Sequence, residues 1–371
     1  MELRNQYRLH RLLASLETNQ WSAAIAACLN SPQSYNKTLA LMELWPQWGR
    51  TDPPSALAYA DSIQDFQDRK SAIAGIARGW AGADPAAASA WARQLPRNRL
   101  KDSAIGAVAS ALAETDPNSA LDLIKTVSAW WEHDGMVFSV FDTWSERAPV
   151  DAANAILQLP DNMTTAKTLE RVVYVWAKTD LAAARTWAES LHEGNLRSTA
   201  RSTVISYWAG QDGQAAAGYI EQLPDGQEKN ELAYNAVLQW VEHDPQPAAS
   251  WAMQYPDDTT ACNMTSNLMH TWAESDPDGA ARWIEGLPAG DIRDGVINAF
   301  AQRTALLDPG RAIRLANTVG DEESRRQATQ QVARQWLKVD AVAAKTWVAQ
   351  SALPDDFKKD FAGSKSYSEQ P

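Results

Sequence analysis

The chain has 371 residues, of which 45% are hydrophobic and 17 are tryptophan. Its formal net charge of -12 and its isoelectric point near 5.0 disfavour nucleic acid as a partner, because an acidic surface repels phosphate. No stretch approaches the roughly 18 apolar residues of a transmembrane helix, so no membrane span is predicted.

One motif recurs every 32 residues along the chain. If its first tryptophan is position 0, that position is Trp in eight of eleven copies: Leu16, Trp48, Trp80, Leu112, Trp144, Trp176, Trp208, Trp240, Trp272, Thr304 and Trp336. Position +8 is Ala in every copy, from Ala24 to Ala344. A second aromatic column stands at +11: Tyr59, Trp91, Trp187, Tyr219, Trp251, Trp283 and Trp347. Such a period predicts a solenoid, whose units bury their apolar faces only against neighbouring units.

The N-terminal region departs most from this motif. Residues 1–16 are predicted to form an amphipathic helix, and they lack the apolar core of a secretory signal. A cytoplasmic chain is therefore expected, or an exported one if a signal segment before Met1 has been removed. In the unit at 16–47, Gln20-Trp21 replaces the Asp-Pro of later units. Residues 1–47 are predicted to be an N-terminal cap with an irregular first repeat.

The second helix of each regular repeat, helix B, has clear start and stop signals. Position +4 is Asp in nine copies, and Pro follows in six of them. An Asp side chain accepts free N–H groups at a helix start, and Pro suits the first helical position. Leu-Pro follows about ten residues later and ends the helix. Helix B is thus predicted to be about 11 residues long, for example 277–287.

The first helix, helix A, precedes the tryptophan. Its apolar residues fall at -8, -7, -4, -3 and 0, as in Ala72, Ile73, Ile76, Ala77 and Trp80, which is the spacing of one helical face. The predicted fold class is all-α. The predicted architecture is a right-handed α-solenoid of about eleven antiparallel hairpins over residues 1–354, with regular repeats from 48 to 354.

Two further segments stand out. The unit at 112–143 carries Trp130 and Trp131 between its helices, and one of them is a possible secondary contact site. After Pro354, residues 355–362 are predicted to form a C-terminal capping helix, and 363–371 a disordered tail.

Helix A also carries a polar stripe at -9, -5 and -2, opposite its apolar face. Many of its residues end in hydrogen-bonding groups rather than in the Glu and Lys of an ordinary solvated face. If helix A lines an inner curve, a ladder of such residues could hold the backbone amides of an extended peptide, with Arg binding a carboxylate. The proposed ladder is Arg171, Tyr174, Tyr207, Asn235, Asn267, His270, Arg303, Gln331 and Arg334. A merely solvated polar face is the alternative.

Catalytic and cofactor motifs are missing from the sequence. The five His residues share no ligand spacing, and Cys28 and Cys262 lie seven units apart, so neither a metal site nor a disulfide framework is predicted. There is no Gly-x-Ser-x-Gly, no His-Glu-x-x-His and no Gly-rich phosphate loop. We predict no cofactor and no enzymatic activity.

The hairpin repeat resembles the tetratricopeptide and HEAT-like class. The combination Trp-Ala-x-x-Asp-Pro-x-x-Ala-x-x-Trp with Leu-Pro is similar to repeats in many uncharacterised bacterial proteins, over about 16–354. Its period is 32 residues rather than 34, and it lacks the tetratricopeptide Gly and Tyr of the first helix, so no ligand-contacting position is transferred. The resemblance implies a scaffold for protein contacts.

The sequence therefore favours a bacterial, non-catalytic scaffold that binds a protein or an extended peptide on the polar face of helix A. Two alternatives are an enzyme built on a helical toroid and a single-stranded RNA-binding helical repeat. An array without insertions offers no long catalytic loop, and the net charge disfavours RNA.

Overall fold

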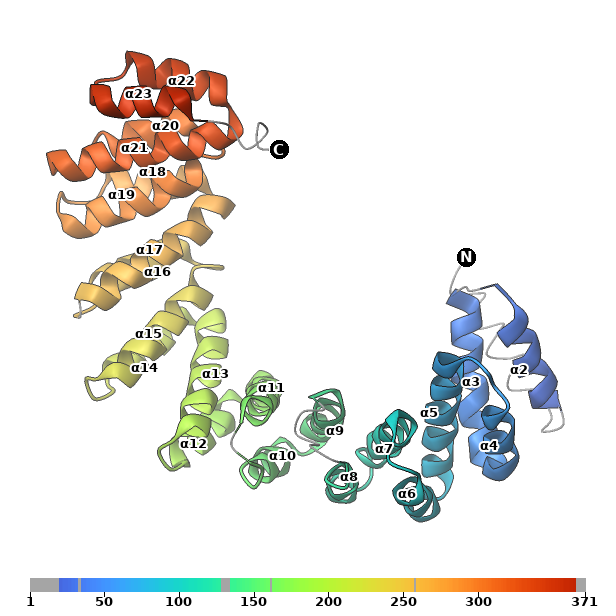
Figure 1. Cartoon of the computed structure of the whole chain (residues 1–371). Coiled ribbons are helices and arrows are strands. Elements are labelled where there is room, and N and C mark those ends of the chain that lie inside the picture. Colours follow the sequence, from blue (N-terminus) through green and yellow to red (C-terminus); the bar gives the residue numbers. More distant parts are fainter. Residues whose placement is uncertain (1–19, 33–34, 128–133, 161, 257, 365–371) are drawn as a thin grey trace. The chain divides into compact units, whose positions relative to one another are not determined.

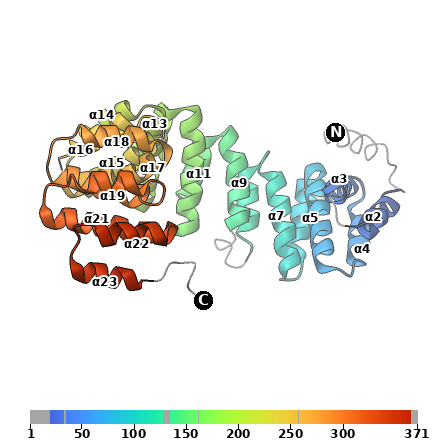
Figure 2. The same ribbon diagram turned by 90° about the horizontal axis from the view of Figure 1, so that it is seen from above.

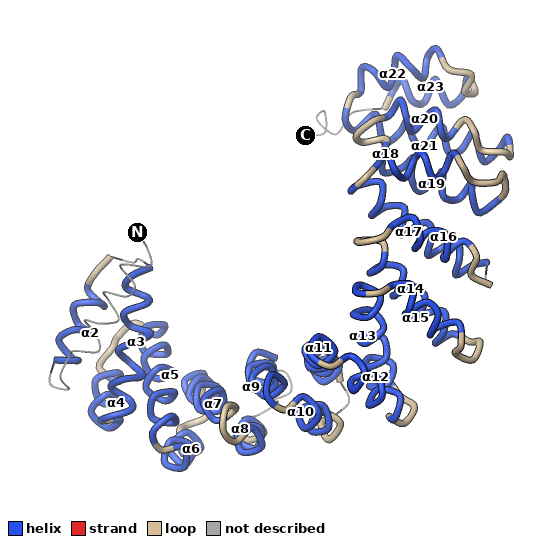
Figure 3. The backbone as a smooth tube through the Cα atoms, turned by 180° about the vertical axis from the view of Figure 1, so that it is seen from behind, coloured by secondary structure: helices blue, strands red, loops and turns tan. Residues whose placement is uncertain are grey.

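Helices make up the regular structure of the chain. The computed structural model describes residues 20–32, 35–127, 134–160, 162–256 and 258–364. Within these ranges it contains 22 helices and no strand, which confirms the predicted all-α class (Figures 1 and 3). The chain divides into two compact units between Thr179 and Asp180, called unit 1 and unit 2 below.

Unit 1 is a succession of helices in which each contacts its neighbours along the chain. Its A helices are α3 (Tyr35–Thr51), α5 (Phe66–Ala83), α7 (Arg99–Leu112), α9 (Asp134–Arg147) and α11 (Met163–Thr179). Its B helices are α2 (Trp21–Asn30), α4 (Pro53–Asp61), α6 (Pro85–Gln94), α8 (Pro117–Ile124) and α10 (Pro149–Ile156). Each A helix contacts the next A helix, and α4, α6, α8 and α10 each contact the A helices before and after them. Figure 2 shows these A helices side by side in a row.

Unit 2 follows the same scheme. Its A helices are α13 (Asn195–Gln211), α15 (Gln227–Trp240), α17 (Asp258–Ser275), α19 (Asp291–Thr304) and α21 (Glu322–Val339). Its B helices are α12 (Leu181–Ser190), α14 (Gly213–Glu221), α16 (Pro245–Met253), α18 (Pro277–Glu285), α20 (Pro309–Ala316) and α22 (Ala341–Gln350), and α23 (Asp355–Gly363) follows. Here too, each A helix contacts the next one, and α14 to α20 contact the A helices on both sides.

The predicted start signal of helix B is confirmed by hydrogen bonds. Eight of the nine +4 aspartates accept a backbone N–H three residues later: Asp52, Asp84, Asp116, Asp180, Asp212, Asp276, Asp308 and Asp340. In the six Asp-Pro copies, Pro occupies the first helical turn, where its missing N–H costs nothing. Asp116 also accepts from the Ser119 hydroxyl, and these two bonds lower the pKa of its carboxyl.

Helix B is shorter than predicted. The helix expected over 277–287 ends at Glu285. The N–H of Gly286 donates to the carbonyl of Trp283 (3.1 Å), and that of Leu287 to the carbonyl of Ile284 (3.1 Å). These i→i+3 bonds tighten the last turn, so the helix closes before Leu-Pro is reached.

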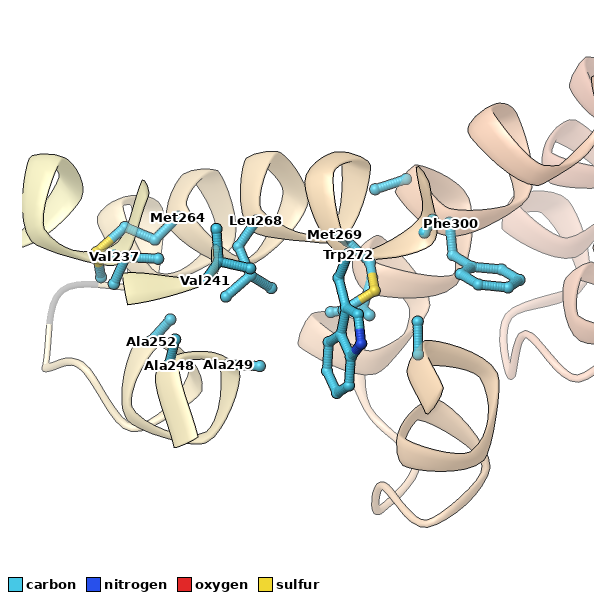
Figure 4. Close-up of a cluster of buried hydrophobic side chains, with 14 of the residues drawn as sticks. Val237, Val241, Ala248, Ala249, Ala252, Met264, Leu268, Met269, Trp272 and Phe300 are labelled. Carbon is cyan, nitrogen blue, oxygen red and sulfur yellow. The ribbon is translucent and has the colours of Figure 1, made fainter. Parts of the chain in front are cut away.

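The column of small residues lies at the centre of the packing. Every +8 alanine from Ala56 to Ala344 is 0% exposed, while Ala24 is half-buried. Figure 4 shows this close packing around α16, where Ala248, Ala249 and Ala252 face side chains of α15 and α17. A side chain of one carbon lets helix B approach its neighbours closely, as the sequence predicts.

The two aromatic columns meet each other. The tryptophans at position 0 are buried or half-buried, which confirms their core role. In six repeats the ring at 0 contacts the ring at +11, with centroids 5.5–6.4 Å apart and the rings tilted: Trp48–Tyr59, Trp80–Trp91, Trp208–Tyr219, Trp240–Trp251, Trp272–Trp283 and Trp336–Trp347. Each such pair ties helix A to helix B of its own repeat.

Glycine allows a close crossing between helices α3 and α5. A Cβ on Gly79 would lie 1.8 Å from the carbonyl oxygen of Pro46, and one on Gly49 would lie 2.3 Å from the carbonyl oxygen of Ile76. Both contacts are with backbone, which cannot move aside as a flexible side chain could.

The C-terminal helix α23 buries Phe357 and Phe361 in a cluster with Leu337 and Val348.

Removal of an aspartate cap should destabilise the fold only where the cap bond exists. We expect Asp276→Ala to lower the free energy of unfolding by about 1 kcal/mol, because the N–H of Gly279 loses its acceptor. Asp244, one repeat earlier and also followed by Pro, forms no side-chain cap bond in the described part of the chain. Asp244→Ala should therefore change stability by less than about 0.5 kcal/mol in urea denaturation followed by circular dichroism. Equal losses in both variants would contradict the role of the cap.

The close crossing predicts opposite effects for two glycine-to-alanine substitutions. Gly79→Ala should cost about 1–3 kcal/mol, because the added methyl group meets the backbone of α3. Gly218→Ala, on α14, meets nothing within 4 Å and should stabilise by about 0.5–1 kcal/mol through helix propensity. Thermal denaturation of both variants measures the sign, and a stabilising Gly79→Ala would refute the crossing.

Candidate functional site

The predicted ladder is divided between the two units. Arg171 and Tyr174 lie on α11 of unit 1. The other members lie in unit 2, on the A helices from α13 to α21: Tyr207, Asn235, Asn267, His270, Arg303, Gln331 and Arg334. Arg171, Tyr174, Asn267, His270 and Arg334 are exposed, and the remaining four are half-buried.

In unit 1, the polar columns form contacts between neighbouring repeats. The hydroxyls of Ser110 at -2 and Ser139 at -5 of the next repeat lie 2.7 Å apart. At the same two positions one repeat later, Arg171 forms an ion pair with Asp142. Hydrogen bonding to Asp142 raises the pKa of the Arg171 guanidinium. The -2 and -5 columns thus link successive A helices here.

The arginines of unit 2 also have partners within the chain. Arg303 lies 2.6 Å from the carboxylate of Glu274. The guanidinium of Arg334 lies over the ring of Phe357, 5.5 Å from its centroid. Exposed ion pairs contribute only about 0–1 kcal/mol, so these contacts orient the side chains more than they stabilise the fold.

Two asparagines of the ladder come together in a groove of about 1160 Å³. Asn235 of α15 and Asn267 of α17, which stand one repeat apart at position -5, both line it. The Nδ2 group of Asn235 donates to the Ser202 hydroxyl (2.8 Å), and that of Asn267 donates to the carbonyl of Asn263 (2.9 Å). Each bond uses one of four hydrogen-bonding positions of a side-chain amide.

Other groove residues were not predicted as site residues: Asn230, Tyr234, Tyr255, Thr260 and Asn263. Asn263 stands at -9, which belongs to the polar stripe. Tyr255 has a clearer signal in the sequence, because it replaces the Leu of Leu-Pro. The Tyr255 hydroxyl donates to Oδ1 of Asn230 (3.0 Å), and its ring contacts Trp251 edge-on. Tyr255 therefore joins the aromatic core to the polar wall of the groove.

The first turn of α15 forms one end of the groove and is held by charged contacts. Gly226 precedes it with φ 156, a conformation that favours glycine. The ammonium of Lys229 donates to the carbonyl of Glu221 (3.2 Å) and to Asp225 (2.9 Å). With these charges paired, the groove offers mainly neutral amides and hydroxyls.

A buried arginine on the neighbouring helix α13 also contacts the first turn of α15. Arg201 of α13 is 8% exposed and lies 2.5 Å from the carboxylate of Glu228. It stands at -7, a position that holds apolar residues such as Ile105 and Leu169 in other repeats. Arg201 therefore replaces an apolar contact by an ion pair between α13 and α15.

Trp130 and Trp131, the possible secondary contact, lie outside the described residues. In the ranges that the structure covers, no three His, Cys, Asp or Glu side chains are arranged to hold a metal ion. Over the same ranges, no helix combines the length and the apolar character needed to cross a bilayer.

The Arg201–Glu228 pair predicts unequal effects of its two partners. Glu228→Gln should cost about 1–3 kcal/mol, because a buried guanidinium loses its counter-charge. Arg201→Leu, which restores the residue type of other repeats, should change the free energy of unfolding by less than about 1 kcal/mol. Urea denaturation of both variants tests this, and a larger loss in Arg201→Leu than in Glu228→Gln would show that the pair itself is needed.

Comparisons with known proteins identify neither a family nor a function for the chain. No family model matches the chain, and no curated protein matches it either. Inferences about its function therefore rest on its residues and their geometry.

Proposed function

We propose that this chain is a non-catalytic scaffold that binds an extended peptide segment of a partner protein in the groove between α15 and α17. The architecture proposed with it is a right-handed α-solenoid of about eleven hairpins with a 32-residue repeat. The observation that carries the proposal is the groove itself, in which side-chain amides of successive repeats, Asn235 and Asn267, line one concave surface.

The chemistry of the groove suits a peptide backbone. A peptide offers one N–H donor and one carbonyl acceptor per residue, and an asparagine amide can bind both. The two tyrosines, Tyr234 and Tyr255, add apolar surface and hydroxyl groups. Recognition pockets commonly combine aromatic walls with a few convergent polar groups.

The spacing of the repeats also favours an extended chain. Neighbouring helices lie about 8–10 Å apart, and an extended peptide rises about 3.3 Å per residue, so equivalent side chains of successive repeats would meet about every third residue. The carboxylate of Glu231, which lines the groove, and the net charge of -12 favour a neutral or basic peptide over an acidic one.

Selection from a random peptide library tests the proposal. Peptides enriched on the intact chain should bind the Asn235→Ala, Asn267→Ala double variant about tenfold more weakly or worse, because each lost hydrogen bond costs about 1 kcal/mol. The Arg171→Ala, Arg334→Ala double variant lies outside the groove and serves as the matched control, with unchanged affinity. Circular dichroism confirms that both variants fold.

Two results would contradict the proposal. One is a library that yields no enriched peptide for the folded chain. The other is a set of enriched peptides whose affinity does not depend on the two asparagines.

A further inference from the structure

The aromatic side chain at +11 occupies a defined place between successive repeats. The Tyr219 hydroxyl donates to Glu189 (2.8 Å), and the Trp251 indole N–H donates to Glu221 (2.8 Å). Both acceptors stand at +13 on the preceding B helix. The ring at +11 thus fills the space beside its own position 0 and turns its donor toward a carboxylate of the preceding repeat.

Four repeats lack this ring, because they hold Ala27, Leu123, Ala155 or Leu315 at +11. In two of them, the +11 residue lines a hollow. Ala155 at +11 lines a hollow of about 760 Å³ in unit 1. Leu315 at +11 lines one of about 340 Å³ in unit 2. The hollow beside Ala155 is larger than the hollow beside Leu315, as expected if an aromatic ring at +11 would have filled this space.

The hollow at Ala155 keeps part of the surroundings that an aromatic ring meets elsewhere. Trp144 at position 0 forms part of its wall, as the position 0 ring lies beside the +11 ring in six other repeats. Pro117, from the preceding repeat, adds a second apolar surface. The +13 residue of the preceding repeat is Lys125 here, so the glutamate acceptor of unit 2 is not repeated. Two other carboxylates, those of Glu114 and Asp151, line the hollow and can accept a hydrogen bond.

We infer that this hollow is a binding site for the indole or phenol ring of a Trp or Tyr side chain presented by a partner protein. The partner's ring takes the place of the missing +11 ring: it packs beside Trp144 and donates its N–H or O–H to a carboxylate at the rim. The same repeat family supplies the pattern, since seven other copies fill this place with Trp or Tyr from their own chain. A buried aromatic anchor of this kind is the usual hot spot of a protein interface.

The chemistry selects the kind of ring. The two carboxylates, Glu114 and Asp151, line the hollow together with the guanidinium of Arg147. A ring with a hydrogen-bond donor can bind a carboxylate and is therefore favoured over phenylalanine. The site is independent of the peptide groove, because it lies entirely in unit 1, at α7 to α10.

The test uses the capped amides of single amino acids as probes of the full chain. N-acetyl-tryptophanamide and N-acetyl-tyrosinamide should bind with dissociation constants on the order of 1 mM, within the range of small fragments. N-acetyl-phenylalaninamide should bind at least about fivefold more weakly, since it lacks the donor. Saturation-transfer NMR gives the three affinities.

Variants decide whether the probes occupy the hollow. Ala155→Trp should abolish probe binding and raise the melting temperature, because the chain then supplies its own ring. Ala155→Leu introduces the residue type found at Leu315 and should weaken probe binding. It provides a second test in case the Trp variant does not fold. Ala90→Trp adds an indole to the exposed face of α6 and should leave binding unchanged.

Three results would overturn the inference. The first is no binding of N-acetyl-tryptophanamide to the intact chain. The second is equal binding by the intact chain and both Ala155 variants. The third is free tryptophan or indole binding far more tightly than the capped amides, which would assign the hollow to a small molecule rather than to a partner's side chain.

Discussion

The contact between the ring at position 0 of helix A and the ring at +11 of helix B is the interaction on which the regular repeats depend, and it is present in six of them. A helix of 8–10 residues is too short to be stable alone, so helix B must gain its stability from tertiary packing. The buried alanine at +8 brings it close to its neighbours, and the aspartate at +4 satisfies its first free N–H groups. The aspartate cap, the close approach at the alanine and the ring contact therefore all stabilise the same short helix, helix B.

The same geometry explains the behaviour of the polar face. Neighbouring A helices lie close enough for their -2 and -5 side chains to bind each other, as Ser110–Ser139 and Asp142–Arg171 do. Part of the polar column on such a helix therefore forms hydrogen bonds and ion pairs within the chain, rather than contacts with a partner. In the groove between α15 and α17, Asn235 donates to Ser202 of α13, and Asn267 donates to Asn263 of its own helix. Both asparagines nevertheless line the surface of the groove.

Departures from the repeat carry most of the functional information. Tyr255 in place of Leu places a hydroxyl on the groove wall, and Arg201 in place of an apolar residue anchors the first turn of α15. Ala155 in place of an aromatic residue leaves a hollow beside Trp144. In each case the surrounding repeats show what the ordinary residue does, so the effect of the exception can be judged against them.

The sequence by itself determined the all-helical class, the starts of the B helices, the buried alanines and the core role of the tryptophans. These features depend on local rules, such as Asp-Pro capping and helical periodicity, that recur in many copies and so can be recognised without coordinates. The sequence placed Asn235 and Asn267 among the nine predicted site residues, but nothing in it distinguished these two from the other seven.

Only the tertiary structure decided what each ladder residue contacts within the chain and which two of them also line a groove. That distinction depends on contacts between residues about 30 positions apart, such as Arg171 with Asp142 and Asn235 with Ser202, and on the shape of the space between two helices. The end of helix B before Leu-Pro was likewise set by i→i+3 bonds at its last turn. Periodicity reveals which residues share a face, whereas side-chain packing determines what that face contacts.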